Sequence, residues 1–350
     1  MHRLFLTCLI AASLLFTLPA CSTNPATGKS QFNLMSTEQE LRLGQEAMPK
    51  FLSSNGGEIT SAEIVNYVRS IGSTLAGLSE RPELPWEFHV IDSAQVNAFA
   101  LPGGKVFFSR GLLAKMDNEA QLAGVLGHEV GHVTAQHIGQ QMSQRIAVGV
   151  TAAALGVAGG VTDNDYLKVL GAGAGIGGTV YLLKFGRDQE SESDMLGMRY
   201  MVKAGYNPVG MLQVMKILKT ASGGGGGQPE WLSTHPLPDT RISRVNALIQ
   251  KRYPDYADNS KYTFNHTRFQ QVVPPNLKRL PKAKHGSKKA SLDGKRQPQL
   301  GPVRAAAFAC WCGNSHQAMS ALGQSASGQG EIKNARLAAA MKRQQALRSD

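Results

Sequence analysis

The chain has 350 residues, which is long enough for two domains, but its charge is distributed as in one domain followed by a basic tail. The formal net charge is +12, and residues 276–350 alone hold 14 lysines and arginines against 3 acids, so the body of the chain is close to neutral. Signal removal and lipidation, both predicted below, leave only Cys310 and Cys312 of the four cysteines, which excludes a disulfide framework.

The N-terminus predicts export. A short basic start is followed by an apolar core over residues 4–18, too short for a stable membrane anchor, and then by Ala20 and Cys21. This order resembles a bacterial lipoprotein signal peptide over residues 1–20, with Cys21 as the lipidated first residue; an ordinary secretory signal is the alternative. Ser22 is not the aspartate that commonly retains lipoproteins in the inner membrane. We therefore expect a periplasmic protein anchored to the outer membrane, with no nucleic-acid partner.

Helix and strand patterns alternate in the first part of the body. Residues 37–51 predict an opening helix with Glu40 placed for a capping box, residues 60–78 a second helix, and residues 86–92 a strand. Residues 95–108 have the pattern of a strand, a Pro-Gly-Gly turn and a second strand.

The most informative motif is His-Glu-Val-Gly-His at residues 128–132. Acids and an asparagine at 117–119 and apolar residues at three- and four-residue intervals predict a helix here, on which His128 and His132 share one face. Two such imidazoles can bind zinc, and Glu129 between them can act as a base on zinc-bound water. Small neighbours, Gly127 among them, allow another element to approach closely. His137 is nine residues from His128 and would point about 180° away on an ideal helix, so we exclude it from the site.

Charge-free stretches rich in glycine and alanine follow at 146–162 and 169–183. Each is shorter than the ~18–20 apolar residues that span a membrane, so we expect a buried or membrane-facing helical hairpin that borders the cleft.

A catalytic zinc needs a third protein ligand. Four acids crowd residues 188–194, at the start of a predicted helix over 190–204, and Glu190 and Asp194 share a face of it. One of them can bind the metal while the other accepts the outer N–H of a ligating histidine. A solvated acidic first turn is the alternative.

The remaining elements are less specific on chemistry alone. A helix is expected over 208–220, and the five glycines at 223–227 either let the following loop move as a lid or merely join two helices. By chemistry alone, His235 is interpreted as a loop residue beside a proline and Arg241 as an ordinary surface cation. Cys310 and Cys312 can form a redox loop or bind metal, or have no function.

Taken together, His-Glu-x-x-His, Glu-x-Glu-x-Asp at 190–194 and Thr-His-Pro at 234–236 followed by an arginine resemble the zinc metallopeptidases that include the CAAX prenyl protease and the HtpX heat-shock protease, peptidase family M48. The likeness covers residues 24–250 and is greatest to the bacterial periplasmic lipoprotein branch. It implies an α+β, mainly helical fold of the zincin (gluzincin) type with a small β-sheet, and one Zn²⁺ per chain. Ser193 departs from the family, which has alanine there.

The resemblance also assigns roles to residues. It implies that Asp194 orients a ligating histidine, and that His235 and Arg241 face the zinc and stabilise the oxyanion, or that His235 caps the metal in a latent state. The strand before the metal helix is expected to pair with extended substrate backbone, although a plain hairpin is the alternative. The expected site comprises zinc ligands His128, His132 and Glu190, base Glu129, and substrate-binding residues Asn97, Ala98, Gly103 and Gly104.

The expected function is that of a zinc-dependent endopeptidase that cleaves unfolded or misassembled envelope proteins by attack of zinc-bound water, in periplasmic or outer-membrane quality control. Two alternatives stay open: a latent protease that acts mainly as a chaperone-like binding factor for outer-membrane proteins, and a structural lipoprotein with an incidental metal site. The expected domains are a linker at 21–35, a peptidase domain at 36–255 and a basic, largely disordered tail at 256–350. The tail either contacts anionic lipid or is a solvated extension.

Overall fold

The computed structural model describes residues 21–154, 184–223, 229, 231–236 and 239–284, all within one compact unit that runs from Met1 to Gly294. The predicted signal peptide, most of the predicted apolar hairpin, most of the glycine run, Cys310 and Cys312 lie outside the described residues.

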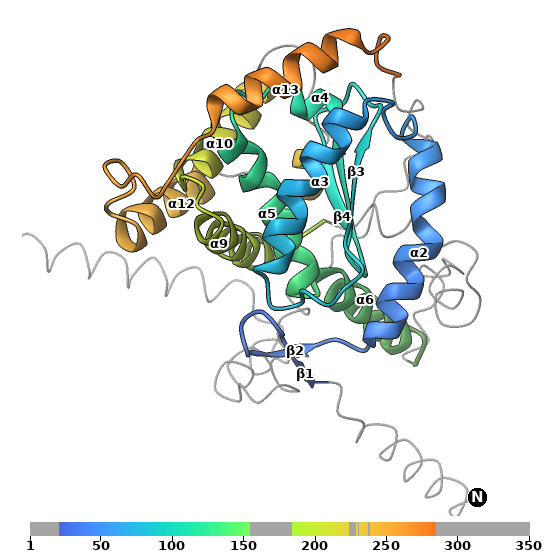
Figure 1. Ribbon diagram of the computed structural model, residues 1–350. Helices are drawn as coiled ribbons and strands as arrows, with labels where there is room; N and C mark the ends of the chain where they lie inside the picture. The colour runs from blue at the N-terminus through green and yellow to red at the C-terminus, as the bar shows by residue number, and fades with distance from the viewer. Residues whose placement is uncertain (1–20, 155–183, 224–228, 230, 237–238, 285–350) are drawn as a thin grey trace, which may run out of the picture. The chain divides into compact units, whose positions relative to one another are not determined.

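The described part is mainly helical with two small sheets, which confirms the predicted fold class (Figure 1). The elements in chain order are β1 (Cys21–Thr23), β2 (Ser30–Phe32), α2 (Thr37–Ser54), α3 (Ala62–Gly77), β3 (Glu87–Ile91), β4 (Ala98–Leu101), β5 (Lys105–Ser109), α4 (Arg110–Leu113), α5 (Glu119–Thr134), α6 (His137–Ala154), α9 (Arg187–Lys203), α10 (Val209–Gly223), α11 (Trp231–Thr234), α12 (Asp239–Arg252) and α13 (His266–Arg279).

The larger sheet has the strand order β3-β5-β4, with β4 at an edge. The predicted hairpin is present: β4 pairs antiparallel with β5, and Gly103 and Gly104 make the turn with φ of 73° and 86°, a left-handed conformation that favours glycine. Side chains alternate across the sheet, so Ala98 and Ala100 pack with the core of α3 and α5, while Phe99 packs with α2 and the start of α6. Helices therefore cover both faces of the sheet.

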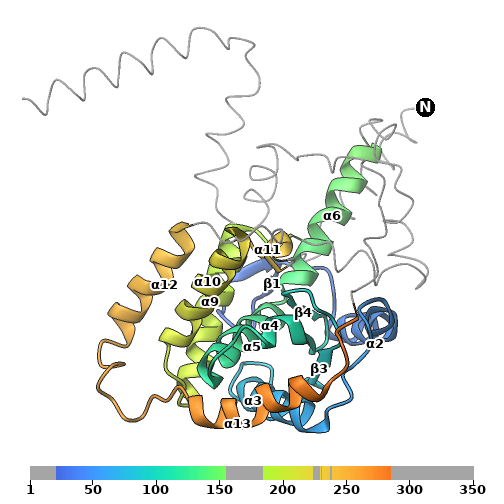
Figure 2. The same ribbon diagram turned by 90° about the horizontal axis from the view of Figure 1, so that it is seen from above.

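Helices α5 and α9 lie side by side, as Figures 1 and 2 both show, and Gly127 and Gly197 make the contact. A Cβ atom built on Gly197 would lie 2.6 Å from the backbone of Gly127 and His128, so neither helix can carry a side chain there. This confirms the expectation that Gly127 permits close approach. The crossing brings the face of α5 that carries His128 and His132 against the acidic first turns of α9.

The start of α2 differs from the prediction. Its N-cap is Ser36, and Gln39 rather than Glu40 completes the capping box. Since the helix begins with Thr37 as its first residue, Glu40 falls on the inner face, where its carboxylate is buried and pairs with Arg81 at 2.7 Å.

Both ends of the described chain pack against the body. The predicted linker contains the antiparallel pair β1–β2, and Gln31 of β2 donates a hydrogen bond to the side chain of Gln136 at 2.7 Å. Helix α13 buries Phe269 and Val273 in the main core, so packing continues past residue 255, the expected end of the peptidase domain. Of the helices that the structure describes, none combines the length and apolarity needed to cross a membrane.

Candidate metal centre

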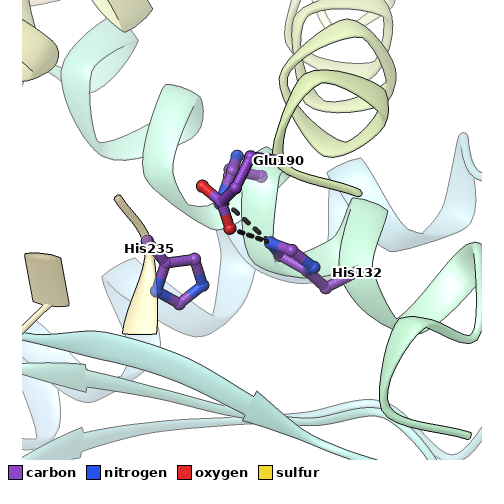
Figure 3. A group of neighbouring side chains, drawn as sticks. His132, Glu190 and His235 are labelled. Carbon is purple, nitrogen blue, oxygen red and sulfur yellow. Dashed lines mark hydrogen bonds and ion pairs between the residues drawn. The ribbon is translucent and has the colours of Figure 1, made fainter. Parts of the chain in front are cut away.

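Three elements place four potential metal ligands in one cluster. Helix α5 contributes His128 and His132, α9 contributes Glu190, and the residue after α11 is His235; their ligand atoms all lie within 4.8 Å of one another. Figure 3 shows the rings of His132 and His235 and the carboxylate of Glu190 pointing toward a common space. All four residues are at most 2% exposed. The predicted ligands are therefore brought together, and His235 joins them.

The two histidines of α5 face each other, and a carboxylate outside the cluster orients His128. The Nε2 atoms of His128 and His132 face each other at 3.0 Å. The Nδ1 of His128 lies 3.0 Å from a carboxylate oxygen of Asp194, the residue expected to orient a histidine. Burial lowers the pKa of His128 to about 4 and that of His132 well below its usual range, so both rings are neutral. With the proton on the outer nitrogen, the Nε2 lone pair of His128 is available to a metal.

Two buried atoms of the cluster support a cation between these residues. Among the described residues, Oε1 of Glu190 and Nε2 of His235 have no hydrogen-bond partner. Burial raises the pKa of Glu190 well above its usual range, although Arg241 opposes this shift. Buried polar atoms without partners are costly, and a metal ion would satisfy both. Two imidazoles and a carboxylate are a ligand set that suits zinc.

Arg241 binds two carboxylates of α9. It donates to Asp194 twice, from Nε at 2.6 Å and from Nη2 at 2.7 Å, and its Nη1 donates to Glu190 and to the carbonyl of Pro236. Burial alone would raise the pKa of Asp194, but the Arg241 charge and hydrogen bonds outweigh it and hold that pKa at about 2. Of the two residues expected to stabilise an oxyanion, Arg241 is thus engaged with carboxylates, whereas Nε2 of His235 is not hydrogen-bonded.

The carboxylate of Glu129 accepts a hydrogen bond from the indole N–H of Trp231 at 3.1 Å. Burial raises the pKa of Glu129 to about 7. The Trp231 ring also stacks on His235, with centroids 4.7 Å apart, and Phe185 stacks on His132 at 3.9 Å. Trp231 was not predicted from the sequence, where its only signal is its place four residues before His235.

The prediction that His137 points away from the site is wrong. Its Nδ1 lies 2.8 Å from Nδ1 of His132, and its Nε2 lies 2.9 Å from a carboxylate oxygen of Glu192. His128 and His137 do not lie on one continuous helix, because α5 ends at Thr134 and Gln136 adopts a left-handed φ of 57° before α6 begins. In the sequence, Glu192 is recognisable only as one of the four acids within residues 188–194, and no partner was predicted for it.

The four expected substrate-binding residues fall into two groups. Ala98 is the first residue of the edge strand β4 and Asn97 directly precedes it. Beside them, the backbone N–H of Trp231 donates to the carbonyl of Val96 at 3.2 Å. Gly103 and Gly104 lie at the far end of β4, in a turn packed against α2 and Trp86. Gly103 lines a small cavity together with His132.

Ser193, the departure from the family pattern, also contacts the site. Its hydroxyl donates to the carbonyl of His128 at 2.5 Å, and its side chain lies against Gly131. The added hydroxyl therefore finds an acceptor in the contact between α5 and α9.

Residues 64–249, which contain the whole cluster, match the model of peptidase family M48. The chain is 30% identical over 256 residues to the beta-barrel assembly-enhancing protease of Yersinia pestis, covering 71% of this chain and 51% of that protein. It is 28% identical over 245 residues to the protein of the same name from Escherichia coli strain K12, covering 69% and 50%. To the mitochondrial metalloendopeptidase OMA1 of Schizosaccharomyces pombe it is 30% identical over 231 residues, covering 64% and 65%. The chain thus spans about half the length of the first two relatives.

Proposed function

Since the chain belongs to peptidase family M48, we propose that it is a zinc-dependent endopeptidase with His128, His132 and Glu190 as metal ligands and Glu129 as the base. One observation carries this proposal: three potential ligands from two helices converge, with their ligand atoms directed inward, beside a buried glutamate.

A zinc ion held by these residues would polarise the scissile carbonyl and lower the pKa of water toward ~7. Glu129 accepts the proton of the attacking water and returns it to the leaving amine, a task for which a pKa raised to about 7 by burial is suited. His235 caps the metal through Nε2 in the closed state, and once it has moved off the metal it donates from Nε2 to the developing oxyanion. The guanidinium of Arg241 fixes the positions of Glu190 and Asp194 relative to the loop that carries His235, because it donates hydrogen bonds to both carboxylates and to the carbonyl of Pro236.

We propose unfolded or misassembled envelope proteins as the substrates. Two relatives are named beta-barrel assembly-enhancing protease, which supports this class. In an antiparallel edge strand, alternate residues direct their backbone groups away from the partner strand. Since Asn97 is hydrogen-bonded to Ser109 at the end of β5, the backbone groups of Ala98 and Ala100 point away from β5. In the closed state the backbone of Ala100 is hydrogen-bonded to Glu129, so a substrate would replace that contact. An extended substrate would pair with these groups, which gives affinity without selecting one side chain.

We propose further that the protein is exported and anchored to the outer membrane through a lipid on Cys21, facing the periplasm. The support is the order of basic start, apolar core and Ala20-Cys21. Cys21→Ser should abolish incorporation of labelled palmitate and release the protein from the membrane fraction. Retention of label in that variant would contradict the assignment.

A latent protease that binds clients is the second candidate, and the closed site favours it. Glu129 and His235 are each 1% exposed, and Trp231 lies on both. In the second function, the segment from Trp231 to His235 would have to move before a substrate carbonyl reached these groups. In this second function, client binding would dominate and cleavage would need an activating event.

The test pairs zinc content with cleavage of an unfolded outer-membrane protein. Glu129→Gln should keep one zinc per chain and lose about 10²–10⁴-fold in cleavage rate, since only proton transfer is removed. Glu63→Gln, at an exposed glutamate of α3, is the matched control and should cleave like the wild type. Unchanged cleavage by Glu129→Gln would contradict the mechanism. If the wild type binds an unfolded client without cleaving it, the second candidate is favoured. If the wild type holds no zinc, both the zinc endopeptidase and the latent protease are excluded.

A further inference from the structure

We infer that His137, held in place by Glu192, is a positioning residue that orients the metal ligand His132. This inference rests on the proposed zinc site, and it extends that site to the first turn of α6 and to the N-terminal hairpin.

The hydrogen-bond chain can run in only one direction if His132 binds metal through Nε2. A neutral His132 then carries its proton on Nδ1 and donates it to Nδ1 of His137, 2.8 Å away. His137 must accept at that atom, so its own proton lies on Nε2 and is donated to Glu192 at 2.9 Å. The Glu192 carboxylate can only accept, which ends the chain. Each proton thus has one position, and the lone pair of His132 faces the metal cluster.

The surroundings hold His137 firmly in this geometry. Its side chain is fully buried, and α6 starts with it immediately after the left-handed Gln136. The side chain of Gln136 is fixed by Gln31 of β2 at 2.7 Å, and that of Asn24 donates to the same Glu192 oxygen at 3.2 Å. The β1–β2 hairpin therefore contacts both the helix break and the outer end of the chain.

The alternative is a histidine–glutamate contact that contributes only to packing, and the protein holds one for comparison. His89 lies 3.1 Å from Glu58, but Glu58 is 35% exposed at its side chain and His89 reaches no member of the metal cluster. Removing the Glu58 carboxylate therefore removes a similar contact without affecting the ligands.

The experiment measures zinc affinity of the full chain by competition with a chromophoric chelator. His137→Phe keeps a ring of similar shape but cannot accept from His132, and should weaken zinc binding by about 10–100-fold. His137→Asn places an acceptor oxygen at the same position as Nδ1 and should recover most of that loss. Glu192→Ala, at a partly exposed position, should weaken binding by about tenfold, and Glu58→Gln should leave it unchanged.

A second measurement separates positioning from packing. In the cobalt-substituted protein, the visible absorption bands report the ligand geometry, so His137→Phe and Glu192→Ala should shift them, whereas Glu58→Gln should not. Wild-type zinc affinity and unchanged cobalt spectra in folded Glu192→Ala and His137→Phe would overturn the inference. Failure of the wild type itself to bind zinc would instead overturn the proposed function, so the two failures are distinguishable.

Discussion

Trp231 donates a hydrogen bond from its indole N–H to the carboxylate of Glu129 at 3.1 Å, so the proposed base is held by the segment that ends in His235. Both ends of this segment are bonded to the chain that borders the site. The backbone N–H of Trp231 donates to Val96 just before β4, and the carbonyl of Thr234 accepts from Phe185 at 3.0 Å. The segment thus lies beside the edge strand that we propose for substrate, and we propose that it moves before cleavage.

Replacing Trp231 by an aromatic residue without the indole N–H tests whether its hydrogen bond to Glu129 keeps the site closed. Trp231→Phe should increase cleavage of a short unfolded peptide about tenfold, because losing a hydrogen bond to a charged group weakens the closed form by about 1.4 kcal/mol or more. Zinc content should not change, because the ring contact of Trp231 with the proposed ligand His128, centroids 5.4 Å apart, is one that a phenylalanine ring keeps. A fall in kcat with zinc intact would mean that the indole serves the reaction itself.

Arg241 is predicted to be essential for stability when no metal is bound. Arg241→Met removes the one cation that touches both Glu190 and Asp194 among the described residues, and leaves two buried carboxylates near each other. Breaking such a pair costs about 3–5 kcal/mol, so the free energy of unfolding of the zinc-free protein should fall by about that much. Denaturant unfolding with and without zinc measures it. Zinc should restore part of the loss because the ion supplies positive charge at Glu190; equal losses in both states would contradict that view.

The turn between β4 and β5 is expected to control substrate pairing rather than zinc binding. Gly104→Ala forces an alanine into a φ of 86° with its Cβ 3.3 Å from Trp86, so the strain of about 1–2 kcal/mol should shift the edge strand and slow cleavage of unfolded protein. Gly57→Ala is the matched control, since Gly57 has a similar φ of 78° but an open surrounding and lies outside the hairpin. Zinc content should stay at the wild-type level in both. If both variants cleave at the same rate, the turn between β4 and β5 does not control substrate binding.

Local spacing explains which parts of the site were predictable from the sequence. His128 and His132 share a face because they are four residues apart on one helix, and Glu190 and Asp194 do so for the same reason. His137 was not predictable by this rule, because the angular relation ends where α5 ends and a left-handed residue turns the chain.

Contacts that arise only on folding were out of reach. The bond from Trp231 to Glu129 joins residues 102 positions apart, and no periodicity marks it. Glu40 shows the converse case: its spacing suggested a cap, but burial beside Arg81 determines its role. The helices and the hairpin could be predicted from the spacing of apolar and turn residues in the sequence. The ion pairs that hold loops against them could not, because they form only when the chain has folded.

The crossing of α5 and α9 supplies the last prediction, because it sets both stability and metal binding. A methyl group at Gly197 would lie 2.6 Å from the backbone of Gly127 and His128, and backbone cannot move aside as a flexible side chain can. Gly197→Ala should therefore lower the free energy of unfolding by about 1–3 kcal/mol and, by separating His128 from Asp194, weaken zinc binding. Gly77→Ala is the control, since Gly77 also lies within a helix but meets nothing within 4 Å, and it should be neutral or slightly stabilising. Calorimetric unfolding and chelator competition on the same samples decide the outcome: a loss of stability with unchanged zinc affinity would show that the helix spacing does not control the metal ligands.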